Sequence, residues 1–206
     1  MKIVFFLFDN FTVLDIAGPY EVLNKLPDTE IIIAGLEKKE YRDIYGLRIS
    51  ADSSIDEIDQ SDILLIPGGT GIDVTLQNER ILSWIRKMNR STTWTISVCS
   101  GSLLLAQAGL LEGKKCTTHW LRKEQMERYN VKFLNERYVQ DGKIITSAGV
   151  SAGIDMALYL VGKIAGEQTA RMIQLAIEYD PKPPLNYIGP HKLPKEIIDK
   201  FKAKNR

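Results

Sequence analysis

The sequence has few cysteines, few histidines and no excess of charge of either sign. Its 206 residues include two cysteines, Cys99 and Cys116, and two histidines, His119 and His191. Two cysteines exclude a disulfide-rich scaffold and fit a reducing cytoplasm, and two histidines argue against a His-rich metal site. Lys and Arg number 27 against 26 Asp and Glu, a net charge of +1. The chain therefore lacks the basic footprint of a nucleic-acid-binding protein and the polybasic face of a membrane-surface protein.

The sequence also has no long apolar run. A membrane-spanning helix needs roughly 18 consecutive apolar residues, and no segment reaches that length. The N-terminal run over residues 3–8 resembles part of a signal peptide, but it stops at Asp9 and no small-residue cleavage site follows. We expect a buried β-strand there and a cytoplasmic protein.

What is present is a composition of 44% hydrophobic and 26% charged residues, typical of one soluble globular domain. Short apolar runs alternate with helical patterns, and we find no repeat or linker. This indicates a single α/β domain over residues 1–206, with a doubly wound, mostly parallel, flavodoxin-like sheet covered by helices on both faces. The expected strands are 3–7, 30–34, 63–66, 93–98, 131–133 and 144–146. The expected helices are 15–26, 78–89, 100–108, 119–129 and 151–165.

Two expectations concern prolines and the C-terminus. Pro19 should be tolerated only in the first turn of its helix. The proline-rich residues 180–184 should form an extended loop. Residues 195–206 read as a solvated terminal helix, with a binding arm as the alternative.

The strongest chemical signal lies at residues 94–102. An apolar strand is followed by Cys99, and then Ser100, Gly101 and Ser102 open an apolar helix. Ligands of open α/β sheets bind outside the carboxyl ends of strands, and a sharp strand-to-helix turn holds a nucleophile exposed there. The helix N-terminus should stabilise a thiolate, and neighbouring N–H groups could hold negative charge on a substrate.

Free cysteines also serve as small buried hydrophobic residues. This alternative remains open for Cys99 and fits Cys116 better, because Cys116 lies in a short strand with no helix opening beside it. We assign Cys116 no role.

Three further segments could contribute to a site with Cys99. The turn at Gly68 and Gly69 follows a buried strand and can aim an N–H into the same crevice, although most such turns are structural. Asp15 could exchange a proton with Cys99, or it could simply be the N-cap of its helix. His119 could be an ordinary helix start.

Together these segments resemble the ThiJ/PfpI superfamily, and within it isonitrile hydratase (isocyanide hydratase). The resemblance covers nearly the whole chain and includes the motifs Asp15-Ile-Ala-Gly-Pro19, Ile66-Pro-Gly-Gly69, Val98-Cys-Ser-Gly-Ser102, Thr117-Thr-His-Trp120 and Tyr179-Asp-Pro-Lys-Pro-Pro184. A sensor-like domain of some AraC-type regulators is similar too, but no second DNA-binding domain is present here.

The resemblance implies specific roles. Cys99 would be the nucleophile and Asp15 its acidic partner. The backbone N–H groups of Gly69 and Ser100 would receive the substrate, and His119 would be an accessory histidine near the thiol. It also implies a homodimer and a small-molecule substrate, with no metal, cofactor, nucleic acid or membrane involved.

Departures from the family patterns decide between its branches. Proteases of the superfamily have His directly after the nucleophile, where this chain has Ser100. Glutamine amidotransferases have a glycine at Ser97 and a His-x-Glu pair, whereas His191 is followed by Lys and Leu. Glyoxalase and deglycase members prefer Glu at the position of Asp15.

The resemblance thus favours hydration of an isonitrile to an N-substituted formamide, by a lyase that needs no cofactor. Two alternatives stay open. One is a glyoxalase- or deglycase-like enzyme that forms a hemithioacetal on Cys99. The other is a non-enzymatic redox or stress-response protein in which Cys99 is reversibly oxidised.

Overall fold

A seven-stranded sheet runs through the middle of the molecule, in the order β10-β11-β7-β6-β1-β2-β5. The computed structural model describes residues 1–185, 189 and 193–204. Neighbouring strands are parallel except for the edge strand β10, which is antiparallel to β11. The strands in chain order are β1 Lys2–Leu7, β2 Glu30–Gly35, β5 Ser53–Ser54, β6 Ile63–Ile66, β7 Trp94–Val98, β10 Tyr138–Asp141 and β11 Ile144–Ser147.

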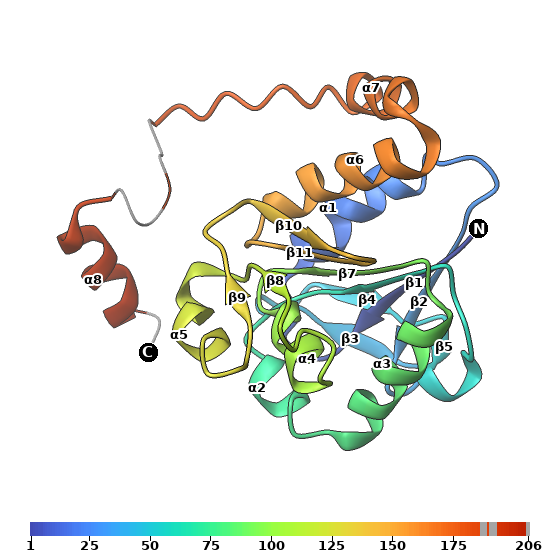
Figure 1. The fold of residues 1–206 in the computed structure, drawn as a ribbon, viewed down its shortest axis with the longest axis horizontal. Coiled ribbons are helices and arrows are strands. Elements are labelled where there is room, and N and C mark those ends of the chain that lie inside the picture. Colours follow the sequence, from blue (N-terminus) through green and yellow to red (C-terminus); the bar gives the residue numbers. More distant parts are fainter. Residues whose placement is uncertain (186–188, 190–192, 205–206) are drawn as a thin grey trace.

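Helices cover both faces of this sheet (Figure 1). On one face lie α1 Val13–Leu23, α6 Ala152–Ala165 and α7 Glu167–Ala176. On the other face lie α2 Ile72–Thr75, α3 Glu79–Ser91 and α4 Gly101–Gln107. This arrangement confirms the predicted doubly wound, mostly parallel α/β fold.

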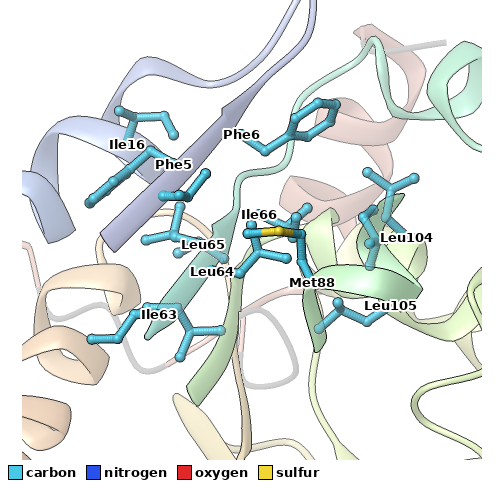
Figure 2. Packing of buried hydrophobic residues seen from close by; sticks show 14 of the residues in the cluster. Phe5, Phe6, Ile16, Ile63, Leu64, Leu65, Ile66, Met88, Leu104 and Leu105 are labelled. Atoms are coloured by element: carbon cyan, nitrogen blue, oxygen red, sulfur yellow. The ribbon is translucent and has the colours of Figure 1, made fainter. Parts of the chain in front are cut away.

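The core forms where β1 and β6 meet helices on both sides. Both strands are apolar almost throughout because each face is covered, so neither alternates with polar residues. Figure 2 shows Phe6 and Leu64 from these strands near Met88 of α3 and Leu104 of α4. All four side chains are inaccessible to solvent. The core therefore fixes the positions of the loops that leave the carboxyl ends of these strands.

Smaller elements lie outside the main sheet. Two two-stranded sheets pair β3 Glu40–Arg42 with β4 Arg48–Ser50, and β8 Lys115–Cys116 with β9 Lys132–Phe133. Short helical segments are η1 Ile55–Glu57, η2 Trp120–Arg122 and α5 Lys123–Met126. Over the described ranges, no helix has the length and apolar character needed to cross a membrane.

Two local predictions are wrong. Helix α1 begins at Val13, so Pro19 lies in its second turn, where the missing N–H interrupts one helical hydrogen bond without ending the helix. The helix expected over 119–129 is instead η2 followed by α5, and His119 is the N-cap of η2.

The C-terminal expectations are met where the structure describes them. Residues 180–184 contain no helix or strand, and α8 spans Lys195–Lys204. His191 lies outside the described residues. The sequence did not predict the edge strand β10, the helix α7 or the β3–β4 sheet. The predicted strand at 131–133 and the short strand at Cys116 are present as β9 and β8, but they pair with each other outside the main sheet.

Candidate active site

Cys99 occupies a sharp turn between β7 and α4. Its φ is +58°, a left-handed conformation that side-chain-bearing residues rarely adopt and that costs about 1–3 kcal/mol. Its N–H donates to the Ser147 carbonyl (3.0 Å), and its own carbonyl accepts from the hydroxyls of Ser102 (3.2 Å) and Thr118 (3.1 Å). These bonds from three segments hold the strained conformation, and the predicted strand-to-helix turn at Cys99 is confirmed.

Asp15 brings a carboxyl group to this turn from α1. The side chain is inaccessible to solvent, and its Oδ2 accepts the N–H of Gly68 at 2.9 Å. Oδ1 is buried and accepts no hydrogen bond from a described N–H or O–H group, while the Cys99 thiol lies within hydrogen-bonding reach of the carboxyl. Asp15 is thus a residue of the first helical turn that points inward, and the alternative that it is the N-cap is wrong, since Thr12 holds that place.

Burial controls the protonation of this pair. It raises the pKa of Asp15 to about 7, against the opposing effects of the Gly68 N–H and the Cys99 thiol. Burial, followed by the nearby Asp15 charge, raises the pKa of the Cys99 thiol well above its usual value. The N–H and hydroxyl of Ser100 favour the thiolate but do not outweigh burial. Burial therefore outweighs the stabilisation of a thiolate expected from the helix N-terminus, and Cys99 is a thiol beside the Asp15 carboxyl group.

The turn after β6 packs directly against the Cys99 turn. The Gly69 N–H donates to the Ser100 hydroxyl (3.1 Å), and that hydroxyl approaches the Gly69 carbonyl (3.3 Å). Gly69 has a φ of +147°, and a Cβ there would lie 2.2 Å from the Asn10 carbonyl oxygen, so only glycine fits. The structure brings Gly69 and Ser100 to Cys99 as expected. However, the Gly69 N–H already has a partner, so the Ser100 N–H is the donor that faces the sulfur.

His119 lies beside Cys99 in its neutral form. Burial, followed by the Arg122 charge, lowers its pKa to about 4. Its Nδ1 accepts the Leu121 N–H at 3.4 Å, which leaves the proton on Nε2. His119 can therefore donate a hydrogen bond at neutral pH but does not carry a positive charge there.

Gly149, just after β11, is a site residue that the sequence reasoning missed. A Cβ at Gly149 would lie 2.2 Å from Cδ2 of His119 and 3.1 Å from the Cys99 sulfur. Glycine at this position therefore lets the imidazole and the thiol approach each other. The sequence offered one signal for this residue: Gly149 is a small residue that follows β11, the strand paired with β7.

The remaining candidate residues lie away from this site. Cys116 is buried in β8, where burial raises its pKa to about 11.

Among the described residues, no three His, Cys, Asp or Glu side chains are grouped so that they could hold a metal ion. Surface pockets of about 280 and 630 Å³ lie at the end of β1 and against α6 and α7, and Cys99 lines neither of them.

An α/β sheet with a cysteine on a strained strand-to-helix turn, beside a buried carboxyl group, defines a class of proteins with a cysteine nucleophile elbow. Comparison with known proteins narrows this class. The chain belongs to the DJ-1/PfpI family, which it matches over residues 1–163.

Individual relatives are similar over most of the chain. The isonitrile hydratase of Pseudomonas putida is 33% identical over 204 residues, which cover 99% of this chain and 90% of the relative. The deglycase PfpI of Pyrococcus furiosus is 30% identical over 71% of this chain and 89% of its own length. The crystal structure of a ThiJ/PfpI family protein from Pseudomonas syringae superposes with a TM-score of 0.94 at 29% identity, covering 98% of this chain and 84% of that one.

Proposed function

We propose that this protein is a cysteine-dependent, cofactor-free hydratase that converts an isonitrile, R–N≡C, to an N-substituted formamide. The observation that carries the proposal is the buried pair of Asp15 and Cys99, in which a carboxyl group with a pKa of about 7 contacts a thiol. Such a pair can move one proton between sulfur and substrate at neutral pH. The similarity to isonitrile hydratase over nearly the full length of both chains supports this reaction.

The first step forms a covalent intermediate. The Asp15 carboxylate takes the thiol proton while the sulfur attacks the terminal carbon of the isonitrile. Asp15 then gives this proton to the same carbon, so a C–S and a C–H bond form and one C–N π bond is lost. The product is a thioimidate, R–N=CH–S–Cys99, and no free thiolate is needed before the attack.

The second step releases the product. Water adds to the thioimidate carbon while Asp15 removes a proton from it, and the proton is delivered to nitrogen. In the adduct R–NH–CH(OH)–S–Cys99, the C–S bond then breaks as the hydroxyl becomes a carbonyl, Asp15 passes the hydroxyl proton to the sulfur, and R–NH–CHO leaves. The Ser100 N–H and the neutral His119 are the donors that would stabilise charge during this step, whereas Gly69 holds the Ser100 hydroxyl in place.

The test is to mix the purified protein with a small alkyl isocyanide and follow the formamide by NMR. We expect turnover that Cys99→Ser abolishes and Cys116→Ala retains, because both cysteines are free and buried but only Cys99 contacts Asp15. No turnover in the wild type, or turnover that survives Cys99→Ser, would contradict the proposal.

A second candidate is glyoxalase- or deglycase-like chemistry, which the similarity to the deglycase PfpI favours. Here the Cys99 sulfur would add to the aldehyde carbon of a 2-oxoaldehyde and form a hemithioacetal. Comparing kcat/KM for methylglyoxal and for the isocyanide separates the two reactions. The redox alternative is less favoured, because Cys99 is only 7% exposed and burial disfavours the thiolate that oxidants attack.

We also propose that the protein acts in the cytoplasm as a homodimer. Two free cysteines fit a reducing compartment. Exposed apolar side chains on α1, close to Asp15 in the chain, offer a surface for a second copy.

A further inference from the structure

A row of aromatic rings leads from the Cys99 sulfur to the C-terminal helix. Both the His119 ring and the sulfur lie within 3.1 Å of the point where a Cβ on Gly149 would be. The rings of His119 and Trp120 are 5.9 Å apart, and those of Trp120 and Phe201 are 5.6 Å apart. Phe201 belongs to α8, so this helix contacts the segment that carries His119.

The start of this row is held firmly to the body of the molecule. Arg122, in the same short helix as Trp120, donates to both carboxylate oxygens of Asp73 in α2, at 3.1 and 2.8 Å. Trp120 itself is partly buried. Its ring therefore forms a fixed surface on which another group can pack.

Helix α8 reaches this surface from far away. In Figure 1 it lies beside α5, at the end of the long segment that follows α7. Residues 180–185 of that segment are exposed. The packing of Phe201 on Trp120 is one contact that places α8 against the body of the molecule.

We propose that the rings of His119 and Trp120 border the path to Cys99, and that Phe201 of α8 covers this path and limits the size of the molecules that pass. Cys99 is 7% exposed, as a narrow path requires. The rings of His119 and Trp120 carry no charge, because His119 is neutral, and the charge of the nearby Arg122 is paired with Asp73. For the hydratase, on which this part of the inference rests, the substrate class is isonitriles with a short, uncharged R group.

The experiment compares two neutral thiol reagents of different size on the full-length protein. Iodoacetamide is small and N-(1-pyrenyl)maleimide is bulky, and the peptide containing Cys99 is quantified by mass spectrometry. The Cys99 thiolate attacks both reagents. A change in the Cys99 pKa therefore alters both rates, and the ratio of the two rates removes this effect. In Phe201→Ala we expect the bulky reagent to gain roughly fivefold relative to the small one, because one aromatic pair is lost.

Matched variants make the result specific. Phe201→Tyr keeps the ring and should keep the wild-type ratio, as should Lys202→Ala at an exposed position of the same helix. Thermal unfolding checks that each variant is folded, and the milder Phe201→Leu replaces Phe201→Ala if the latter is not. An unchanged ratio in a folded Phe201 variant overturns the proposal. An equal gain for both reagents also overturns it, because that indicates general loosening.

A parallel assay connects the cover to the reaction. The ratio of kcat/KM for cyclohexyl and methyl isocyanide should rise in Phe201→Ala together with the reagent ratio. If no isocyanide is turned over but the reagent ratio changes, the proposed function fails while the size limit set by Phe201 stands. If isocyanides are turned over and neither ratio changes, the proposed function stands while the size limit set by Phe201 fails.

Discussion

The Asp15 carboxyl group is buried, so its charged form is poorly solvated, and it lies where it could exchange a proton with the Cys99 thiol. It receives one backbone N–H, from Gly68, and contacts the Cys99 thiol, while the rest of its surroundings exclude water. At pH 7 it is therefore close to half ionised. A residue that must take a proton from sulfur and return it to carbon works best when its pKa is near the working pH.

We expect Asp15→Asn to lower isocyanide turnover by roughly 100- to 10,000-fold, the usual contribution of a general acid–base residue. In the wild type, kcat/KM should rise with pH through about 7, as Asp15 ionises and can accept the thiol proton. The matched control is Asp62→Asn, which alters an exposed carboxylate that also accepts one backbone N–H, that of Lys2. A variant Asp15→Asn with the wild-type rate and pH profile would contradict the proton-transfer role.

The same residue should affect stability in a pH-dependent way. The folded protein raises the pKa of Asp15 from 3.8 to about 7, so between these values the native state binds more protons than the unfolded state. The free energy of unfolding therefore falls as pH rises through this interval. Asp15→Asn removes this effect, so we expect the variant to be more stable than the wild type at pH 8, with the difference shrinking toward pH 4. Urea unfolding at both pH values measures it, and a constant difference would contradict the prediction.

Sequence could predict some of these residues and not others. Cys99 was predicted from its place between an apolar strand and an apolar helix, whereas the role of Asp15 was predicted from the resemblance to the ThiJ/PfpI superfamily. Gly149 was not, because its role depends on how closely His119 and Cys99 approach, and the chain order does not show that distance. The direction of the Cys99 pKa was wrong for the same reason, since burial outweighs the helix N-terminus only once packing is known.

At the scale of elements, the geometry of the site depends on the contact between the turn after β6 and the turn after β7, where the Gly69 N–H donates to the Ser100 hydroxyl. Gly69→Ala should displace the turn after β6 from this position, because the new Cβ would meet the carbonyl of Asn10, in the loop after β1, at 2.2 Å. We expect the free energy of unfolding to fall by about 1–3 kcal/mol, the usual cost of backbone strain. We also expect turnover to be lost. Gly46→Ala is the control, since Gly46 also has a positive φ, +94°, but nothing lies within 4 Å of the added Cβ. Equal losses of turnover in the two variants would show that strain alone, and not the contact with Asn10, is responsible.

Element predictions succeeded where local pattern and tertiary packing agree. The strand at 63–66 was predicted with its observed bounds because it is apolar throughout and ends at a proline and two glycines. Strand β10 was missed because an edge strand is specified by its antiparallel pairing with β11 rather than by its own composition. The interior Pro19 was predicted wrongly because packing of α1 against α6 stabilises a helix that proline alone would interrupt.

At the scale of the whole molecule, the near balance of charge leaves association to apolar contacts. On α1, Leu14 is 40% exposed and Tyr20 39% exposed, six residues apart, and the buried Asp15 follows Leu14 directly. Large apolar side chains that are partly exposed can contribute to a surface that binds another protein. A second copy placed there would lie next to the segment that carries Asp15, the proposed general acid.

We therefore expect sedimentation equilibrium to give about twice the chain mass of 23.3 kDa, and Leu14→Glu to weaken the dimer roughly tenfold or more, because a charge would be buried in the interface. Leu175→Glu is the matched control, since this leucine is 76% exposed on α7 and away from α1. If the dimer requires the α1 face, only Leu14→Glu shifts the equilibrium toward monomer. Equal weakening by both variants would place the interface elsewhere, and a wild-type protein at the mass of one chain would exclude it. Because Asp15 lies one residue from Leu14, a reduced kcat in the Leu14→Glu monomer would further show that association supports the position of α1 in the site.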